Sequence, residues 1–197
     1  MLGVKRPTQV RYQGVVYKIH DDYRNILNTI RLLDELNIDD FETELDFIIE
    51  QNAIVVQTIF GSNAPICETL AVKANDVIWN YAEDRELEDE PAVQDLVQDY
   101  PVYKMDILRE FNKDIEKLDY LSWNDFISMV GSLSSDSNMA QYVKIRSTKL
   151  KDIDKNKRQE FKKIQDKIKI KRKEVVSKES VFDEYMRKAK ENYNRKE

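Results

Sequence analysis

The sequence predicts an all-α, mainly helical protein with a short N-terminal β-hairpin, a compact helical body and a long C-terminal amphipathic helix. Glycine and proline are scarce, with four of each in 197 residues. Sandwiches and barrels need many tight turns rich in these residues, so their scarcity disfavours a β fold. Apolar residues instead recur at the spacing of amphipathic helices. A hydrophobic content of 41% excludes a wholly disordered chain, and 35% charged residues give a large solvated surface.

The chain begins with a hairpin and a first helix. Two runs rich in β-branched and aromatic residues, 9–12 and 15–19, flank Gln13-Gly14, which is typical of a tight turn between two strands. Asp21 and Asp22 then offer carboxylates that can cap a helix. We expect this helix to run from Tyr23 to about Leu36.

Two further helices follow. The second is predicted to open at Asp39-Asp40 and to run toward Phe60, and its inward stripe begins with Phe41, Leu45, Ile48 and Ile49. The run 61–65 contains Gly and Pro and breaks the helix. A third helix is predicted from Ile66 to about Tyr81.

The segment 82–100 is strongly acidic and is predicted to be an exposed linker. A fourth helix starts at Pro101, with an inward face predicted to contain Tyr103, Ile107, Leu108, Phe111 and Ile115. Ser122, followed by Asp125, caps a fifth helix that buries Trp123, Phe126, Ile127 and Val130. A short sixth helix is expected near residues 139–145.

The charge divides the chain into two parts. Residues 144–197 contain 20 Lys and Arg against 10 Asp and Glu, or about +10, whereas residues 1–143 contain 12 against 27, or about −15. We therefore predict an acidic helical domain over residues 1–146, which includes the hairpin and the 82–100 linker, and a basic, long helical arm over residues 147–197.

The arm lacks Gly and Pro from residue 154 to residue 193 and is predicted to form a long helix with coiled-coil-like spacing, broken near Ser177. Its apolar positions are the predicted partner-binding residues, namely Phe161, Ile164, Ile168, Val175, Phe182 and Met186. Three interpretations remain open: a solvated helix, a helix that packs on another chain or copy, and a nucleic-acid contact through the lysines between 162 and 173.

Known catalytic and cofactor-binding motifs are absent from the sequence. The single histidine, His20, excludes paired-histidine zinc sites, and the common phosphate-binding glycine loops do not occur. The single cysteine, Cys67, excludes an intramolecular disulfide and is compatible with a reducing compartment. With no apolar signal core or membrane span in the sequence, we expect a soluble, non-enzymatic protein that needs no cofactor or metal and contacts no membrane.

One motif resembles a known family. Leu121, Trp123, Phe126, Leu133 and Arg146 match the core pattern of the phage gene product fifteen family, small proteins encoded among the tail genes of phages and prophages of Gram-positive bacteria. The chain departs from that pattern at Ser122, where the family has histidine, at Asn124, where it has a second tryptophan, and at Ile145, where it has tyrosine. Asp22-Tyr23-Arg24, Trp79-Asn80-Tyr81 and Asp106-Ile107 are also similar, so the resemblance covers about residues 9 to 170.

The resemblance implies an all-α tail assembly chaperone that binds the phage tape-measure protein until tail-tube subunits replace it. Such a protein works in the host cytoplasm during assembly and is absent from the mature virion. Its expected partners are the tape-measure protein, the tail-tube protein and further copies of itself. The alternatives are a nucleic-acid-binding accessory protein that uses the basic arm and a structural virion or connector component.

Overall fold

The computed structural model describes residues 8–79 and 92–171. The structure is mainly helical with one two-stranded sheet at the N-terminus, as predicted. The elements are β1 (Gln9–Tyr12), β2 (Val15–Lys18), α1 (Tyr23–Glu35), the 3-10 helix η1 (Ile38–Asp40), α2 (Glu44–Phe60), α3 (Glu68–Trp79), α4 (Tyr100–Phe111), η2 (Ile115–Lys117), α5 (Trp123–Gly131), α6 (Asn138–Ser147), η3 (Leu150–Asp152), η4 (Lys155–Lys157) and α7 (Arg158–Ile168).

The hairpin forms where the sequence places it. β1 and β2 are antiparallel, with Tyr12 opposite Val15, and they are joined by Gln13 and Gly14. Both turn residues have positive φ, 47° and 81°, as a two-residue turn between right-twisted strands requires. Gly14 adopts this conformation without the steric cost that a side chain would add.

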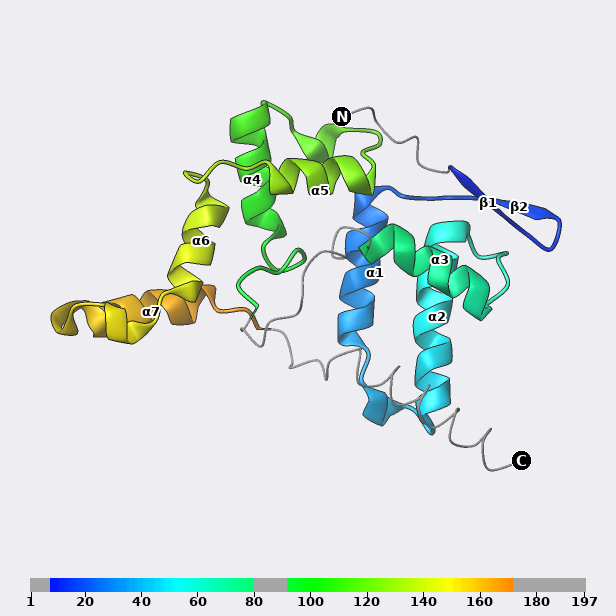
Figure 1. Cartoon of the computed structure of the whole chain (residues 1–197), viewed down its shortest axis with the longest axis horizontal. Coiled ribbons are helices and arrows are strands. Elements are labelled where there is room, and N and C mark those ends of the chain that lie inside the picture. Colours follow the sequence, from blue (N-terminus) through cyan, green and yellow to red (C-terminus); the bar gives the residue numbers. More distant parts are fainter. Residues whose placement is uncertain (1–7, 80–91, 172–197) are drawn as a thin grey trace, which may run out of the picture.

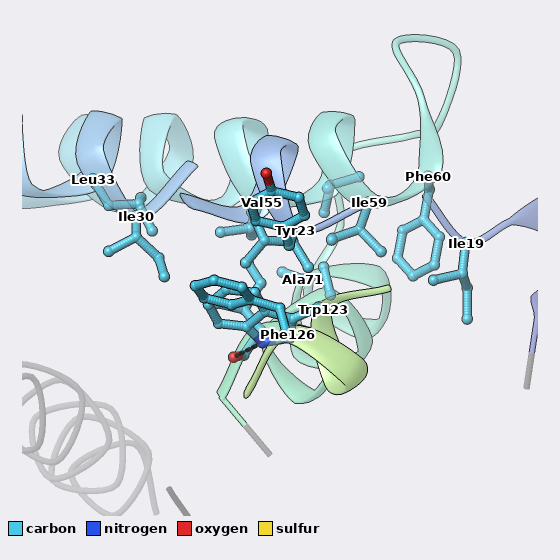
Figure 2. Close-up of a cluster of buried hydrophobic side chains, with 14 of the residues drawn as sticks. Ile19, Tyr23, Ile30, Leu33, Val55, Ile59, Phe60, Ala71, Trp123 and Phe126 are labelled. Atoms are coloured by element: carbon cyan, nitrogen blue, oxygen red, sulfur yellow. Dashed lines mark hydrogen bonds between the residues drawn. The ribbon is translucent and has the colours of Figure 1, made fainter. Parts of the chain in front are cut away.

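The core lies between α1, α2, α3 and α5, as Figure 1 shows. α1 and α5 begin side by side, because the amide of Tyr23 donates to the carbonyl of Leu121 at 3.0 Å and the amide of Trp123 donates to Asp21 at 2.7 Å. Figure 2 shows the rings of Tyr23, Trp123 and Phe126 gathered against the side chains of α1 and α2.

The second half of the described chain extends away from this core. α4 packs on both α5 and α6, and α6 packs on α7, which lies at one end of the molecule in Figure 1. The core residues are Ile19, Tyr23, Ile26, Ile30, Leu33, Val55, Val56, Ile59, Phe60, Ala64, Leu70, Ala71, Ala74, Ile78, Ile107, Ile115, Leu121, Trp123 and Phe126.

Two predicted inward faces are corrected. The first turns of α2 extend past the core, so Leu45 and Ile49 are exposed and the buried face of α2 begins only at Val55. On α4, Tyr103 and Ile107 are buried, but Leu108 and Phe111 face solvent. The periodicity predicted that both helices exist, although α2 begins at Glu44 and not at Asp39-Asp40, which lie in η1. It could not tell whether another element covers the apolar face.

The acidic linker and the long C-terminal helix are also corrected in part. Residues 80–91 lie outside the described residues, but Asp95 and Asp99, at the end of the predicted exposed linker, are buried. α7 ends at Ile168, and Lys169 is extended, so the helix predicted over residues 154–193 is interrupted after Ile168, and the predicted break near Ser177 lies outside the described residues. Gln98 pairs with this extended segment, donating to the carbonyl of Lys169 at 2.9 Å and accepting from the amide of Lys171 at 2.8 Å.

Candidate functional site

An open groove of about 790 Å³ lies between α5, α6 and the segment before α4. Its floor contains the buried side chains of Tyr103 and Met139, and its apolar walls are half-buried. Its rim is polar and includes Gln94 and Ser134. The apolar residues of the walls are Leu96, Ile127, Val130, Leu133 and Val143.

The α5 wall is fixed by the start of that helix. The Ser122 hydroxyl accepts the amide of Asp125 at 3.1 Å and donates to its carboxylate at 2.8 Å, as the capping pattern predicts. The indole of Trp123 donates to the carbonyl of Ile78 at 2.9 Å, the bond drawn in Figure 2. The Phe126 ring stacks on Trp123, with the ring centroids 5.6 Å apart. With these residues buried on one side, the C-terminal half of α5 directs Ile127 and Val130 to the groove.

The α6 wall is held at its N-terminus by a buried carboxylate from α4. Asp106 is fully buried and accepts the amides of Asn138 and Met139 at 3.2 and 2.8 Å. The Ser137 hydroxyl accepts the amide of Ala140 at 3.0 Å. Amides at a helix N-terminus lack partners within the helix and favour negative charge, so Asp106 locks the start of α6 onto α4.

The other end of α6 is held by a buried ion pair. The Arg146 guanidinium donates two hydrogen bonds to the Asp99 carboxylate, at 2.6 and 2.7 Å, and the two side chains are 6% and 3% exposed. Arg146 also donates to the carbonyls of Ile168 at 2.7 Å and Val93 at 3.1 Å. The hydrogen bonds to Asp99 raise the pKa of Arg146, so the arginine stays charged. One side chain therefore joins α6, α7 and the segment before α4, which contributes Gln94 and Leu96 to the groove.

The two carboxylates make α4 and α6 an antiparallel pair. Asp99, just before α4, meets the end of α6, and Asp106, in the middle of α4, meets the start of α6. The groove wall thus has a fixed position relative to its floor, although few buried apolar residues join α4 and α6.

A comparison with protein families identifies the chain. The model of the bacteriophage Gp15 protein matches residues 5–170, which is 166 of the 197 residues. The chain belongs to the Gp15 family. The match extends over the core, the groove, the ion pair and α7. No curated protein and no solved structure matches the chain.

The residues that carry the Gp15 resemblance fall into two groups. Leu121, Trp123 and Phe126 are buried in the core. Leu133 lines the groove, and Arg146 holds the wall of the groove through Asp99. The motif residues therefore lie partly in the core and partly at the groove.

The predicted partner-binding residues of the arm are only partly within the described chain. Phe161 and Ile168 are half-buried on α7, whereas Ile164 is 42% exposed. Gln165, on the same helix, donates to the carbonyls of Ile145 and Thr148 at 2.8 Å, so α7 folds back against α6. Val175, Phe182 and Met186 lie outside the described residues.

The sequence did not identify Asp99 and Asp106 as site residues. Asp106 carries a usable signal, because it lies between Tyr103 and Ile107 on the buried side of α4, where a charge needs a partner. Asp99 carried no such signal, because its acidic neighbours suggested a solvated linker.

Within residues 8–79 and 92–171, no group of three or more His, Cys, Asp and Glu side chains is placed to bind a metal ion. No helix in the same part of the chain combines the length and apolar character needed to cross a membrane.

Proposed function

We propose that this Gp15-family protein is a non-enzymatic tail assembly chaperone, and that the groove between α5 and α6 binds a helical segment of the phage tape-measure protein. The observation that carries the proposal is the apolar groove with its polar rim. The phage family supports it, and so does the tail-gene resemblance of the motif that ends at Arg146.

The chemistry of the groove suits an amphipathic helix. Ile127, Val130 and Val143 offer aliphatic surface from two helices, which is how apolar grooves bind the apolar stripe of a partner helix. Polar groups at the rim, such as Ser134, can stay in contact with water while a client is bound. A groove that is open to solvent allows release, which a chaperone needs when the tail-tube subunits take over its client.

The proposal requires no chemical step. The only histidine, His20, is exposed, lies two residues after β2 and does not line the groove. The acidic and basic side chains around the groove hold its helices in place, as Asp106 and Arg146 do, and we assign them this role. We place the protein in the host cytoplasm during assembly and outside the finished virion.

Co-expression with the tape-measure and tail-tube proteins tests the proposal. Leu133→Asp/Val143→Asp places two charges in the groove and should abolish retention of the tape-measure protein, whereas Leu133→Ser/Val143→Ser should weaken it. Val72→Asp, on an exposed position of α3, is the matched control. Circular dichroism checks that each variant is folded. Retention of neither phage protein by the wild-type chain, or equal retention by folded wild-type and groove variants, would contradict the proposal.

A second function, nucleic-acid binding, is favoured by one observation. The segment 144–171 carries 12 Lys and Arg against 4 Asp and Glu, so most of the positive charge of the arm lies in the described region. DNA binding whose affinity falls steeply with salt, and which Lys162→Glu/Lys163→Glu abolishes, would support this function. A third alternative, a structural virion component, predicts that the protein is found in purified virions.

A further inference from the structure

The segment that connects α1 to α2 carries both acidic and exposed apolar side chains. We define the acidic tip as residues 34–50, which contain eight Asp and Glu and no Lys or Arg. Within it, Ile38, Leu45 and Ile49 are 40%, 54% and 47% exposed. Exposed apolar side chains surrounded by negative charges are typical of a surface that binds a basic, partly apolar partner.

Local structure keeps this surface exposed. Thr43 caps α2, its hydroxyl accepting the amide of Asp46 at 3.1 Å, so the helix starts well before it reaches the core at Val55. The rings of Phe41 and Phe47, both within the tip, meet edge to face with centroids 5.4 Å apart. Leu45 and Ile49 lie four residues apart on one helix face, which no other element covers in the described part of the chain.

The complementary surface lies on α7 and the turn before it. Residues 155–171 contain eight Lys and Arg against two Asp and Glu. Lys162, Lys163 and Lys167 are exposed, and Ile164 between them adds apolar surface. We call this set the basic face of α7. Its charge is opposite to that of the acidic tip, and each surface has exposed aliphatic side chains for the other to cover.

The two surfaces are far apart within one molecule. Figure 1 shows α7 at one end of the long axis and the start of α2, with η1, in another part of the molecule. A contact between them must therefore form between copies. Such a contact joins two different patches, so it repeats from copy to copy and gives a ring or an open chain.

We propose that the acidic tip of one copy binds the basic face of α7 in a second copy, giving head-to-tail association that salt weakens. The association needs no client and does not depend on the chaperone proposal. Screening lengths shrink from about 30 Å at 0.01 M ionic strength to about 3 Å at 1 M, so the electrostatic part of the contact is strong only at low salt.

Sedimentation velocity of the full chain at low and high salt is the first measurement. We expect a mass that rises with protein concentration at low salt and returns to that of a single chain at high salt. A chain that stays monomeric at low salt over the whole concentration range overturns the proposal.

Charge reversal identifies the surfaces. Asp40→Lys/Glu42→Lys/Glu50→Lys reverses three exposed charges of the tip, and Lys162→Glu/Lys163→Glu/Lys167→Glu reverses three exposed charges of the basic face. Each variant alone should be monomeric at low salt, because the changes reduce the charge of the tip from −8 to −2, or that of the basic face from +6 to 0, and so remove most of the attraction between the two surfaces. An equimolar mixture should associate again, because each variant offers the surface that the other lacks.

A matched control separates the contact from general charge effects. Asp76→Lys/Asp119→Lys/Asp136→Lys makes the same change in net charge at exposed positions outside both surfaces, and it should associate like the wild-type chain. A mixture that stays monomeric, or a control that loses association as fully as the tip variant, overturns the proposal. A failure of client binding in the groove variants leaves these results unchanged, so the two proposals fail separately.

Discussion

Arg146→Met should strongly destabilise the protein. The change removes four hydrogen bonds, two of them to the Asp99 carboxylate. Asp99 stays buried and keeps the hydrogen bond that it accepts from the amide of Asp95 at 3.0 Å. Removing one partner of a buried ion pair costs about 3–5 kcal/mol, because the charge left behind is neither solvated nor neutralised. For a chain of this size, that cost corresponds to a fall in Tm of roughly 6–20 °C.

The assay is urea unfolding followed by tryptophan fluorescence, with Arg31→Met as the matched control. Arg31 also pairs with a carboxylate, Glu35, at 3.2 Å, but both side chains are exposed, so its loss should cost less than about 1 kcal/mol. Arg146→Lys keeps the charge but cannot form both hydrogen bonds to Asp99. Its loss of stability should therefore lie between the losses of Arg146→Met and Arg31→Met. In Arg146→Met/Asp99→Asn the buried charge is gone, so part of the stability should return. If Arg146→Met costs no more than Arg31→Met, the ion pair does not stabilise the α4–α6–α7 arrangement as argued.

Three further predictions follow from the same structure. Trp123→Phe keeps the ring in the core but leaves the carbonyl of Ile78 without its indole donor, and scanning calorimetry should show a loss of about 1–3 kcal/mol, with an unchanged Tm contradicting it. Asp106→Ala leaves the first amides of α6 without an acceptor, and urea unfolding should show a loss of at least about 1–2 kcal/mol. The Arg24 guanidinium, hydrogen-bonded to Asp22, holds the pKa of that carboxyl below its ordinary value of 3.8. The stability it contributes is therefore complete above that value and is lost as the pH falls through the lowered pKa. In unfolding measured from about pH 5 to about pH 2, Asp22→Asn should lose less stability than the wild-type chain, and parallel curves would refute this role.

Local chemistry made much of the fold predictable. The Gln13-Gly14 turn and the capping residue Ser122 act within a few residues of their own positions, and both behave as the sequence indicates. The burial of Trp123 and Phe126 also follows from helical spacing.

The remaining features depend on residues distant in the chain. Nothing near Ile168 ends a helix, but Arg146 bonds its carbonyl and Gln98 pairs with the extended residues after it. Likewise, the apolar spacing of Leu45 is equally compatible with a covered and an exposed face. The groove lies between α5, α6 and the segment before α4, which contacts between distant residues bring together. No single stretch of sequence therefore indicates it.

The paired starts of α1 and α5 constrain the order of events during synthesis. Tyr23 and Trp123 are neighbours in the fold but are separated by 100 residues of chain. At ribosomal rates of about 5–20 residues per second, the first helix waits roughly 5–20 s for the tryptophan that completes its packing. During that interval the apolar faces of α1, α2 and α3 have only one another to contact, so the nascent chain passes through its most aggregation-prone stage before α5 leaves the ribosome.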